Sequence, residues 1–412
     1  MTFNSILQNN KILYFIIACT LIVFAFGDVA NTIVFRNSRQ LEEVQYGLEE
    51  VQYGKISIFF RAFFEIFVIF CLLNGQKIGI YFEKLFLLLI TLVSTSILGF
   101  LSLQINPLTA ELGTFIVNLN KSLFLFICFY FIFTIFEKLR DSQKRKIFKI
   151  YELIVYANGF CAILGLIFDI PLFYTYSQRH RFGFSGFLPA QNEASLFWLI
   201  ALFYGYIVLN EEKRIFPLIM AIAGSVLLGT KAALISVVVS LMWFGWKFHR
   251  RTFMIYLFAS IFTISCLVSI FFRENVVDIL NSFEYFQFYL YRIDKGQDFL
   301  TLLLSGRNEF MDRFFIQTDN WNFVNYLFGG YLYTMEMDFF DSLIFFGIIG
   351  LILYFICFGF VFRNISSRYR IMFVSLYFSM AALGGHVFWS AVNTLYIVLF
   401  ILRTSKLGRF CK

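Results

Sequence analysis

Two clusters of basic side chains in this sequence have the chemistry needed to bind phosphate. Arg179, His180 and Arg181 form a continuous run, and Lys231 follows Gly-Thr in an otherwise apolar stretch. Arginine and lysine bind phosphate oxygens by charge and hydrogen bonding. Inserting a lysine at the centre of the bilayer costs about 2.5–3.5 kcal/mol of free energy, so such a lysine usually faces a polar cavity or a partner of opposite charge. The alternative for both clusters is a membrane anchor, whose long basic side chain reaches the interface.

Two further groups later in the chain add an arginine and several carboxylates. Arg307 belongs to the run SGRNE, whereas Glu336 and Asp338 belong to MEMDFFDS, directly before a long apolar run. The alternative for the two acidic residues is helix capping, because a carboxylate near a helix N-terminus is stabilised by the macrodipole. GTK at Lys231 lacks the upstream glycines of a nucleotide-binding P-loop, which excludes that class of site.

Histidine and cysteine spacing gives no sign of a metal site. His180, His249 and His386 do not pair at the spacing of metal ligands, and six of the seven cysteines lie in apolar segments. His386 is expected to satisfy a local hydrogen bond. We therefore predict no bound metal, no cofactor and no disulfide framework.

The segments that must position these groups are overwhelmingly apolar. Of the 412 residues, 59% are hydrophobic and 15% charged, whereas soluble domains carry about 25% charged residues. The net charge of +8 comes from basic residues in short clusters beside apolar runs, so we predict no nucleic-acid partner. The composition predicts an all-α polytopic membrane protein whose surroundings are the lipid bilayer.

Apolar runs divide the chain into about twelve transmembrane helices, because a bilayer core about 30 Å thick requires about 20 apolar residues per helix. The predicted helices lie near 11-27, 57-74, 82-103, 113-136, 147-169, 193-209, 214-229, 231-246, 253-272, 339-361, 371-384 and 386-402. The short ones are inferred from parity, since basic clusters flank 215-246 and 371-402 and each stretch must cross and return. We predict a single membrane domain over 1-412.

The distribution of charge predicts which side of the membrane each connection occupies. Lysine and arginine cluster on one side, which the positive-inside rule makes cytoplasmic, together with both termini. The opposite side carries the segments 28-56, 170-192 and 273-338. The last of these has ten acidic residues against five basic ones. It is too long for a plain turn, and its apolar clusters predict short helices along the interface or over a cavity.

Four motifs in chain order resemble the bacterial O-antigen polymerase and O-antigen ligase superfamily. They are the Arg-rich loop before NEAS, the GTKAALIS turn, SGR in the largest external loop, and E-x-D-x-x-D-x-L-x-x-x-G-I-I-G. The resemblance covers roughly 175-352 by motif and the whole chain by topology. In relatives the turn often reads Ser-Arg, so Lys231 keeps the charge but not the bidentate geometry of arginine. The ligase branch has a histidine eleven residues before the first glycine of the GxxG helix, where this chain has Glu336, so it looks more like a polymerase.

The resemblance implies metal-independent glycosyl transfer at the periplasmic face of the bacterial inner membrane. Donor and acceptor would be oligosaccharide repeat units linked to undecaprenyl pyrophosphate, joined into a long surface polysaccharide, and a chain-length regulator protein is a candidate partner. Cationic side chains would stabilise the leaving pyrophosphate, and a carboxylate would act as the base. The pyrophosphate-binding candidates are Arg179, Arg181, Lys231 and Arg307, and the catalytic candidates are Glu336 and Asp338.

Two alternatives remain open at the level of the sequence. An O-antigen ligase would transfer the finished glycan to the lipid A core, but the histidine-asparagine pair of that branch is absent. A lipid-linked oligosaccharide flippase would be a transporter with a similar number of helices. It would be expected to carry its charges inside the bundle and would need no large external loop.

Overall fold

The protein is helical throughout the part of the chain that the computed structural model describes. That part comprises residues 9–42, 55–73, 80–103, 108–176, 182–188, 190–248, 321–330, 337–383 and 385–405, with single residues 301, 315, 318 and 319. The helices are α2 (Asn10–Glu42), α3 (Lys55–Leu73), α4 (Ile80–Ser102), α5 (Leu108–Lys138), α6 (Asp141–Phe168), η1 (Pro171–Phe173), α7 (Gln191–Glu212), α8 (Phe216–Leu227), α9 (Lys231–Phe248), α15 (Phe323–Phe328), α16 (Asp338–Phe362), α17 (Ser367–Leu383) and α18 (Thr394–Thr404).

Six helices of the described residues are long and apolar enough to cross a membrane, which confirms the predicted class of helical membrane protein. They contain the segments Asn10–Val34, Glu83–Ser102, Glu111–Lys138, Asp141–Phe168, Gln191–Glu212 and Asp338–Phe362. The helices α3, α8, α9, α17 and α18 overlap five further predicted spans. The predicted span 253-272 lies outside the described residues, as does most of 273-338.

Two predicted boundaries are wrong. The segment 28-56 was expected to begin an external loop at Asp28, but α2 continues as a helix to Glu42. Asp28 ends the apolar run in the sequence. Because Arg61 pairs with its carboxylate inside the bundle, the helix can continue past this charge. The predicted span 386-402 is helical only from Thr394, and residues 385–393 form a non-helical segment whose backbone is bonded to a side chain of α16.

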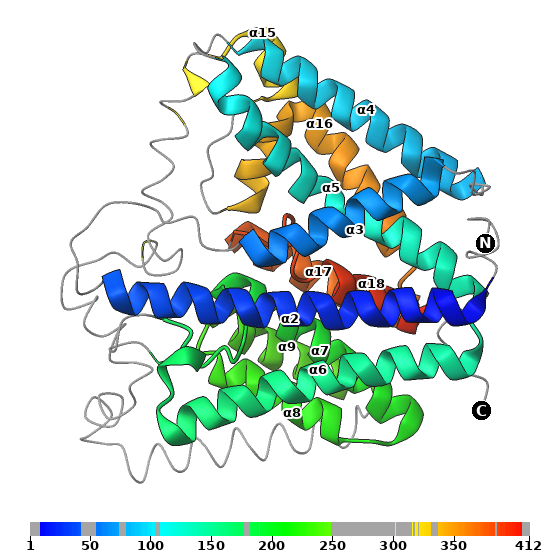
Figure 1. The fold of residues 1–412 in the computed structure, drawn as a ribbon, viewed down its shortest axis with the longest axis vertical. Coiled ribbons are helices and arrows are strands. Elements are labelled where there is room, and N and C mark those ends of the chain that lie inside the picture. Colours follow the sequence, from blue (N-terminus) through cyan, green and yellow to red (C-terminus); the bar gives the residue numbers. More distant parts are fainter. Residues whose placement is uncertain are drawn as a thin grey trace.

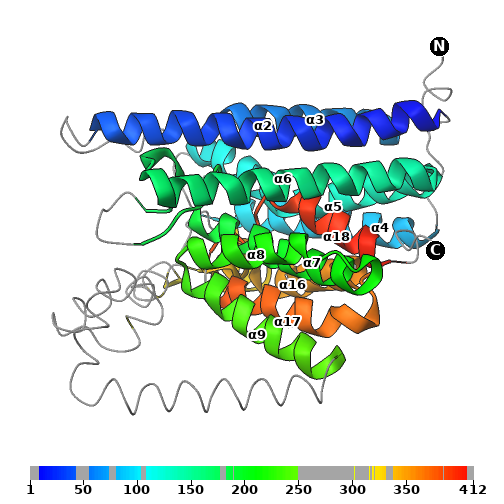
Figure 2. The ribbon, with the colours of Figure 1, turned by 90° about the horizontal axis from the view of Figure 1, so that it is seen from below.

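The helices pack in layers with α7 near the centre. Figure 1 shows α2 lying horizontally across the middle of the molecule, and Figure 2 shows α2 and α3 on one face with α9 and α17 on the opposite face. Every residue of α7 from Ala194 to Val208 is buried. In contrast, α6 exposes apolar side chains such as Leu153, Phe160 and Phe168, which is expected where a helix faces lipid.

The two ends of the bundle are chemically different, and we name one of them the basic end. There, Gln143 of α6 donates to the backbone carbonyl of Asn10 at 2.9 Å, and Nζ of Lys247 donates to the carbonyl of Arg368 at 2.6 Å. The basic end therefore brings together the start of α2 and α6, the end of α9 and the start of α17. The starts of α3, α7, α9, α16 and α18 are directed to the other side, which we name the far end.

The helix α16 is interrupted at Gly347, the first glycine of GIIG. Gly347 has φ of +64° and ψ of −174°, which separates two helical halves. The segment 321–330 fills the break: the backbone N–H of Gly330 donates to the carbonyl of Phe345 at 3.0 Å. Asn325 fixes the same segment to α4 through hydrogen bonds to the Gly99 carbonyl at 3.2 Å and the Ser102 hydroxyl at 2.6 Å. The end of the longest predicted loop is thus anchored between α4 and α16.

Candidate functional site

A buried ion pair joins α2 to α3 inside the apolar part of the bundle. The Nη2 atom of Arg61 lies 2.6 Å from Oδ1 of Asp28, and the two side chains are 9% and 1% exposed, respectively. Asp28 falls within the apolar stretch Asn10–Val34, about 27 Å along the helix axis from Asn10. In a bilayer core about 30 Å thick, this distance places Asp28 towards the far end of the span. Ionisable residues inside membrane segments usually pair and mark functional positions. Asp28 and Arg61 are therefore candidates that the sequence reading did not single out.

One helical turn further along α3, Glu65 extends the polar layer to α5. Its Oε2 atom accepts a hydrogen bond from Nδ2 of Asn120 at 2.6 Å, and Glu65 is buried. Asn118 and Ser122 on the same part of α5 are also buried. Lys121, next to Asn120 in the sequence, is exposed. The helix α5 thus brings the amide group of Asn120 to Glu65, and it carries the exposed Lys121 next to this contact in the sequence.

Glu193 on the first turn of α7 completes this arrangement of charges. Arg61, Asp28, Lys121 and Ser390 lie close enough to act on the charge of its carboxylate. Glu193 is partly buried. We name the five charged residues Asp28, Arg61, Glu65, Lys121 and Glu193 the charged layer. They come from four helices that are far apart in the sequence.

The non-helical segment 385–393 is bonded to the start of α7 through Asn393. The Nδ2 atom of Asn393 donates to the backbone carbonyl of Glu193 at 2.8 Å and also contacts Oγ of Ser390 at 3.1 Å. Both Ser390 and Asn393 are buried. Irregular backbone at membrane depth is tolerated only where protein buries it or where it lines a cavity. This segment therefore belongs to the interior of the protein, next to the charged layer.

Asp338 fixes the other end of segment 385–393. Its two carboxylate oxygens accept hydrogen bonds from the backbone N–H groups of His386, Val387 and Phe388, at 2.7, 2.6 and 2.7 Å. His386 has φ of +65°, and Asp338 is only 2% exposed. Three hydrogen bonds from backbone N–H groups fix the carboxylate to segment 385–393. Asp338 was predicted as a catalytic candidate. In the structure, its carboxylate binds backbone N–H groups of segment 385–393 and therefore has a structural role.

The predicted phosphate-binding residue Lys231 is the first residue of α9 and lies close to the start of α7. The hydroxyl groups of Thr230 and Ser195 are 2.7 Å apart, and Oγ1 of Thr230 accepts a hydrogen bond from the backbone N–H of Ala233 at 3.2 Å. Thr230 therefore caps α9 and ties it to α7, two residues after Glu193. The sequence GTK adopts this turn because Gly229 has φ of +69° and lies against the backbone carbonyl of Phe182.

That contact brings the base of the Arg-rich loop to the same turn. The backbone N–H of Phe184 donates to the carbonyl of Leu227 at 2.7 Å, and Oγ1 of Thr175 donates to the carbonyl of Leu228 at 3.0 Å. Thr32 of α2 donates to the carbonyl of Phe187 at 2.7 Å. The segments on both sides of the loop are therefore held between α2 and the turn before α9.

The remaining predicted site residues lie outside the described residues. They are Arg179, Arg181, Arg307 and Glu336. For the first two, the structure places the flanking segments beside the turn that carries Lys231.

The sequence contained a signal for the charged layer that the prediction did not use. Arg61 and Glu65 both interrupt the apolar run FFRAFFEIF, and Asp28 follows another apolar run in FGDVANT. Charges inside predicted spans are functional candidates by default. The prediction assigned Asp28 to a loop and concentrated on the external segments, so it missed the partners that these charges have.

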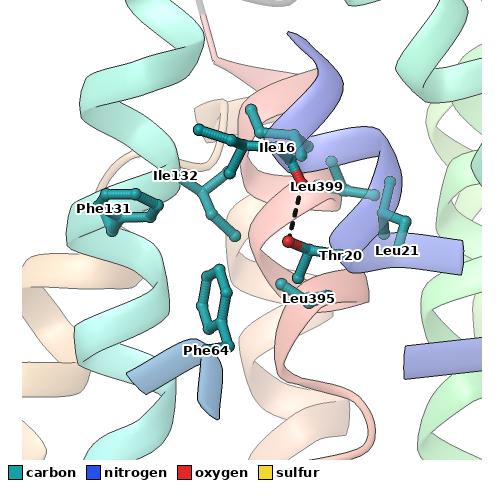
Figure 3. Close-up of a pocket in the computed structure, with 9 residues that line it drawn as sticks. Ile16, Thr20, Leu21, Phe64, Phe131, Ile132, Leu395 and Leu399 are labelled. Carbon is teal, nitrogen blue, oxygen red and sulfur yellow. Dashed lines mark hydrogen bonds between the residues drawn. The ribbon is translucent and has the colours of Figure 1, made fainter. Parts of the chain in front are cut away.

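A small apolar cavity between α2, α3, α5 and α18 is a packing feature rather than a site. Figure 3 shows its lining by Ile16, Leu21, Phe64, Phe131, Ile132, Leu395 and Leu399. Its one hydroxyl group, that of Thr20, donates to the carbonyl of Ile16 at 2.7 Å within the same helix. The cavity therefore offers no polar group that could orient a substrate.

Salt bridges at the basic end connect neighbouring helices. Arg214 makes two hydrogen bonds to the carboxylate of Glu152, at 2.8 and 2.7 Å, and the buried Arg403 pairs with Glu211 at 2.8 Å and with Glu212 at 3.0 Å. The bonds to Glu152 raise the pKa of the Arg214 guanidinium. These contacts join α6, α7 and α18, and each charge has a partner of opposite sign.

In the charged layer, lysine and arginine can stabilise negative charge, and the carboxylates can accept a proton. Among the residues that the structure describes, no three histidine, cysteine, aspartate or glutamate side chains are placed to hold a metal ion together. No family model matches the sequence, and no match was found among curated proteins or solved structures. The features that point to a function are therefore the sequence motifs and the geometry of the charged layer.

Proposed function

We propose that this protein is a bacterial surface-polysaccharide polymerase of the O-antigen type. It would join oligosaccharide repeat units linked to undecaprenyl pyrophosphate, by metal-independent glycosyl transfer. The observation that carries the proposal is the charged layer: five charged side chains from four helices gather within an otherwise apolar bundle. The turn with Lys231 joins α7 two residues after Glu193.

The arrangement suits a reaction between two lipid-linked substrates. Each substrate has its lipid in the bilayer and its pyrophosphate and sugars at the membrane surface, so the reacting atoms meet near the end of a membrane helix bundle. Pyrophosphate is a good leaving group, and nearby cations stabilise the charge that develops on it. A carboxylate close to the same point can accept the proton of the attacking hydroxyl.

The proposal includes a topology and a location. Twelve crossings place both termini and the basic end in the cytoplasm, and the far end with segment 273-338 in the periplasm of the inner membrane. The positive-inside rule supports this orientation, because lysine and arginine gather at the basic end. A chain-length regulator protein would meet the enzyme at the periplasmic side.

The direct test is to incubate the purified protein with a lipid-pyrophosphate-linked repeat unit, without added metal, and to separate the products by size. The expected result is a ladder of lengthened glycans. Arg307→Ala is expected to abolish the ladder at an unchanged protein level, because a cation assigned to the leaving pyrophosphate is lost. Repeat units that stay unextended across a panel of sugar compositions would contradict the proposed function.

A second candidate function is transport of lipid-linked oligosaccharides across the bilayer. The buried pair of Arg61 and Asp28 favours it, because a flippase is expected to carry charges inside its bundle. The same purified protein in liposomes separates the two functions. Transfer of unextended units between leaflets, with no ladder, would support the transporter.

A further inference from the structure

The cations at the basic end differ in the groups that they contact. Arg214 and Arg403 pair with glutamates of α6 and α7. Lys247, at the end of α9, instead donates to the backbone carbonyl of Arg368 at 2.6 Å, and its Nζ atom lies 4.3 Å from the centre of the Trp243 ring. A carbonyl group and a ring do not neutralise a full positive charge. Among the described residues, Lys247 has no carboxylate partner.

The turn between α16 and α17 adds two arginines beside this lysine. Arg363 directly follows α16, Arg368 lies in the first turn of α17, and both side chains are exposed. Arg370 holds the turn closed, because its guanidinium donates to the backbone carbonyl groups of Arg363 at 2.7 Å and of Ile365 at 3.0 and 2.8 Å. The run from Arg363 to Arg370 contains no acidic residue. We name Lys247, Arg363 and Arg368, which are all exposed, the basic junction.

Exposed apolar side chains on two helices lead to the basic junction. On α16, Ile352 and Ile356 are 55% and 42% exposed, and their spacing from Arg363 places all three on one face of the helix. On α17, Ile371 is 75% exposed and lies one turn after Arg368 on the same face. In a membrane such faces contact acyl chains. Each arginine therefore stands at the point where the chains of a lipid end and its headgroup begins.

Two tryptophans of α9 match the same level of the membrane. Trp243 contacts the ammonium group of Lys247, and Trp246 is 49% exposed. Tryptophan is enriched at the interface between membrane and water, where its ring lies among the headgroups. Basic side chains near the end of a membrane helix likewise extend toward the interface. The basic junction is therefore placed at the depth of the lipid phosphates in the adjacent leaflet.

We propose that the basic junction binds the headgroup phosphate of an anionic phospholipid, whose acyl chains lie along the exposed apolar faces of α16 and α17. The ammonium group of Lys247 has three N–H donors, of which one is bonded to the Arg368 carbonyl, so two remain for phosphate oxygens. The guanidinium groups of Arg363 and Arg368 bind phosphate oxygens in pairs. The site lies at the opposite end of α9 from Lys231, so the inference does not depend on the proposed polymerase.

The test measures lipid binding by the purified full-length protein in detergent micelles. Dioleoyl phosphatidylglycerol is titrated into the protein, and native mass spectrometry counts the lipids that stay bound. Dioleoyl phosphatidylcholine has the same chains and a headgroup without net charge. The wild-type protein is expected to bind the anionic lipid about tenfold more tightly or better, because lysine and arginine at the membrane surface attract anionic headgroups. Equal affinity for the two lipids would overturn the proposal.

Charge removal at the basic junction is the second arm. The variant Lys247→Gln/Arg363→Gln/Arg368→Gln is expected to bind phosphatidylglycerol about tenfold more weakly or worse, with unchanged binding of phosphatidylcholine, because each cation contributes to the attraction. If this variant loses its melting transition in the absence of lipid, Arg363→Gln/Arg368→Gln takes its place. It keeps the bond from Lys247 to the backbone of α17 and should still lower the affinity severalfold.

A matched control removes the same number of charges elsewhere at the basic end. Arg145, Lys146 and Lys149 are exposed on α6, and the variant Arg145→Gln/Lys146→Gln/Lys149→Gln has the same net charge as the first triple variant. Its affinity for phosphatidylglycerol is expected to stay within about threefold of the wild-type value, since distant exposed charges are screened. An equal loss in both triple variants would show a general field rather than a site and would overturn the proposal.

The last arm separates a lipid from a soluble phosphate ligand. Glycerol 1-phosphate offers the same phosphate chemistry without acyl chains. It is expected to compete poorly with phosphatidylglycerol, because it makes no contact with the apolar faces of α16 and α17. Displacement of the lipid by an equal concentration of glycerol 1-phosphate would mean that the basic junction takes a soluble anion, and the assignment to a phospholipid would be wrong.

Discussion

At the scale of single residues, the charges inside this bundle are placed in pairs and networks. Breaking a buried pair leaves an uncompensated charge, whereas replacing both partners by apolar residues is often neutral or stabilising. The pair of Asp28 and Arg61 is therefore weak evidence for stability and better evidence for function. The Arg403 contacts at the basic end are different, because both of its partners are half-exposed and solvent screens them.

This reasoning predicts a strongly non-additive mutant cycle. Arg61→Met leaves the Asp28 carboxylate buried without its ion-pair partner and is expected to cost about 3–5 kcal/mol. Asp28→Leu should have a comparable effect, because it isolates Arg61. The double variant is expected to regain most of the loss, as measured by thermal unfolding in detergent. Losses that simply add in the double variant would show that the pair is not coupled.

The double variant also separates stability from function. It is expected to be folded but slow in polymerisation, because the charged layer has lost its buried cation, Arg61. A fully active double variant would mean that the buried pair serves packing alone.

At the scale of the elements, the break in α16 decides how the last part of the external segment is anchored. The backbone conformation of Gly347, with φ of +64° and ψ of −174°, is adopted almost only by glycine and costs a residue with a Cβ atom about 1–3 kcal/mol. A Cβ at this position would also lie 2.4 Å from the backbone nitrogen of Gly329. The glycine of the GIIG motif is therefore required by the backbone contact between segment 321–330 and α16.

Two glycines of the same helix provide a matched comparison. Gly347→Ala is expected to lower the melting temperature and to expose the amides of 321–330 to hydrogen exchange, because the segment must move away from the break. Gly359→Ala has no atom within 4 Å of the new Cβ and lies in a regular helix. It should stabilise the protein by about 0.5–1 kcal/mol. Equal melting temperatures for the two variants would contradict the packing seen at Gly347.

At the scale of the whole molecule, the two ends of the bundle are expected to face different compartments. Lys213 is exposed in the connection between α7 and α8 at the basic end, and Asp319 is exposed beside the segment that docks on the end of α4. If the bundle spans the bilayer as proposed, these positions lie on opposite sides.

Cysteine labelling tests this arrangement in a background without the native cysteines. Lys213→Cys should react with a membrane-impermeant maleimide only in inside-out vesicles, and Asp319→Cys only in right-side-out vesicles. Labelling of both positions from the same side would contradict the topology. The protein level of each variant serves as the control for correct insertion.

The sequence by itself determined the class of protein and most helix positions. Hydropathy is a local property, and a run of apolar residues such as 339-361 forms a membrane helix in almost any context. The observed α16, Asp338–Phe362, differs from that prediction by one residue at each end. The charge bias between connections likewise follows from the sequence and predicts the orientation.

Only the tertiary structure decided which polar residues meet. Asp28 and Glu193 are far apart in the chain, and no periodicity indicates that α2, α3, α5 and α7 bring their charges together. From local patterns, Asp338 was a candidate base, with helix capping as the alternative. The folded chain gave it a third role, since the N–H groups of His386, Val387 and Phe388 are presented to it by a segment that the sequence had predicted to be helical. Side-chain partners depend on helix packing, and packing is set by the whole chain.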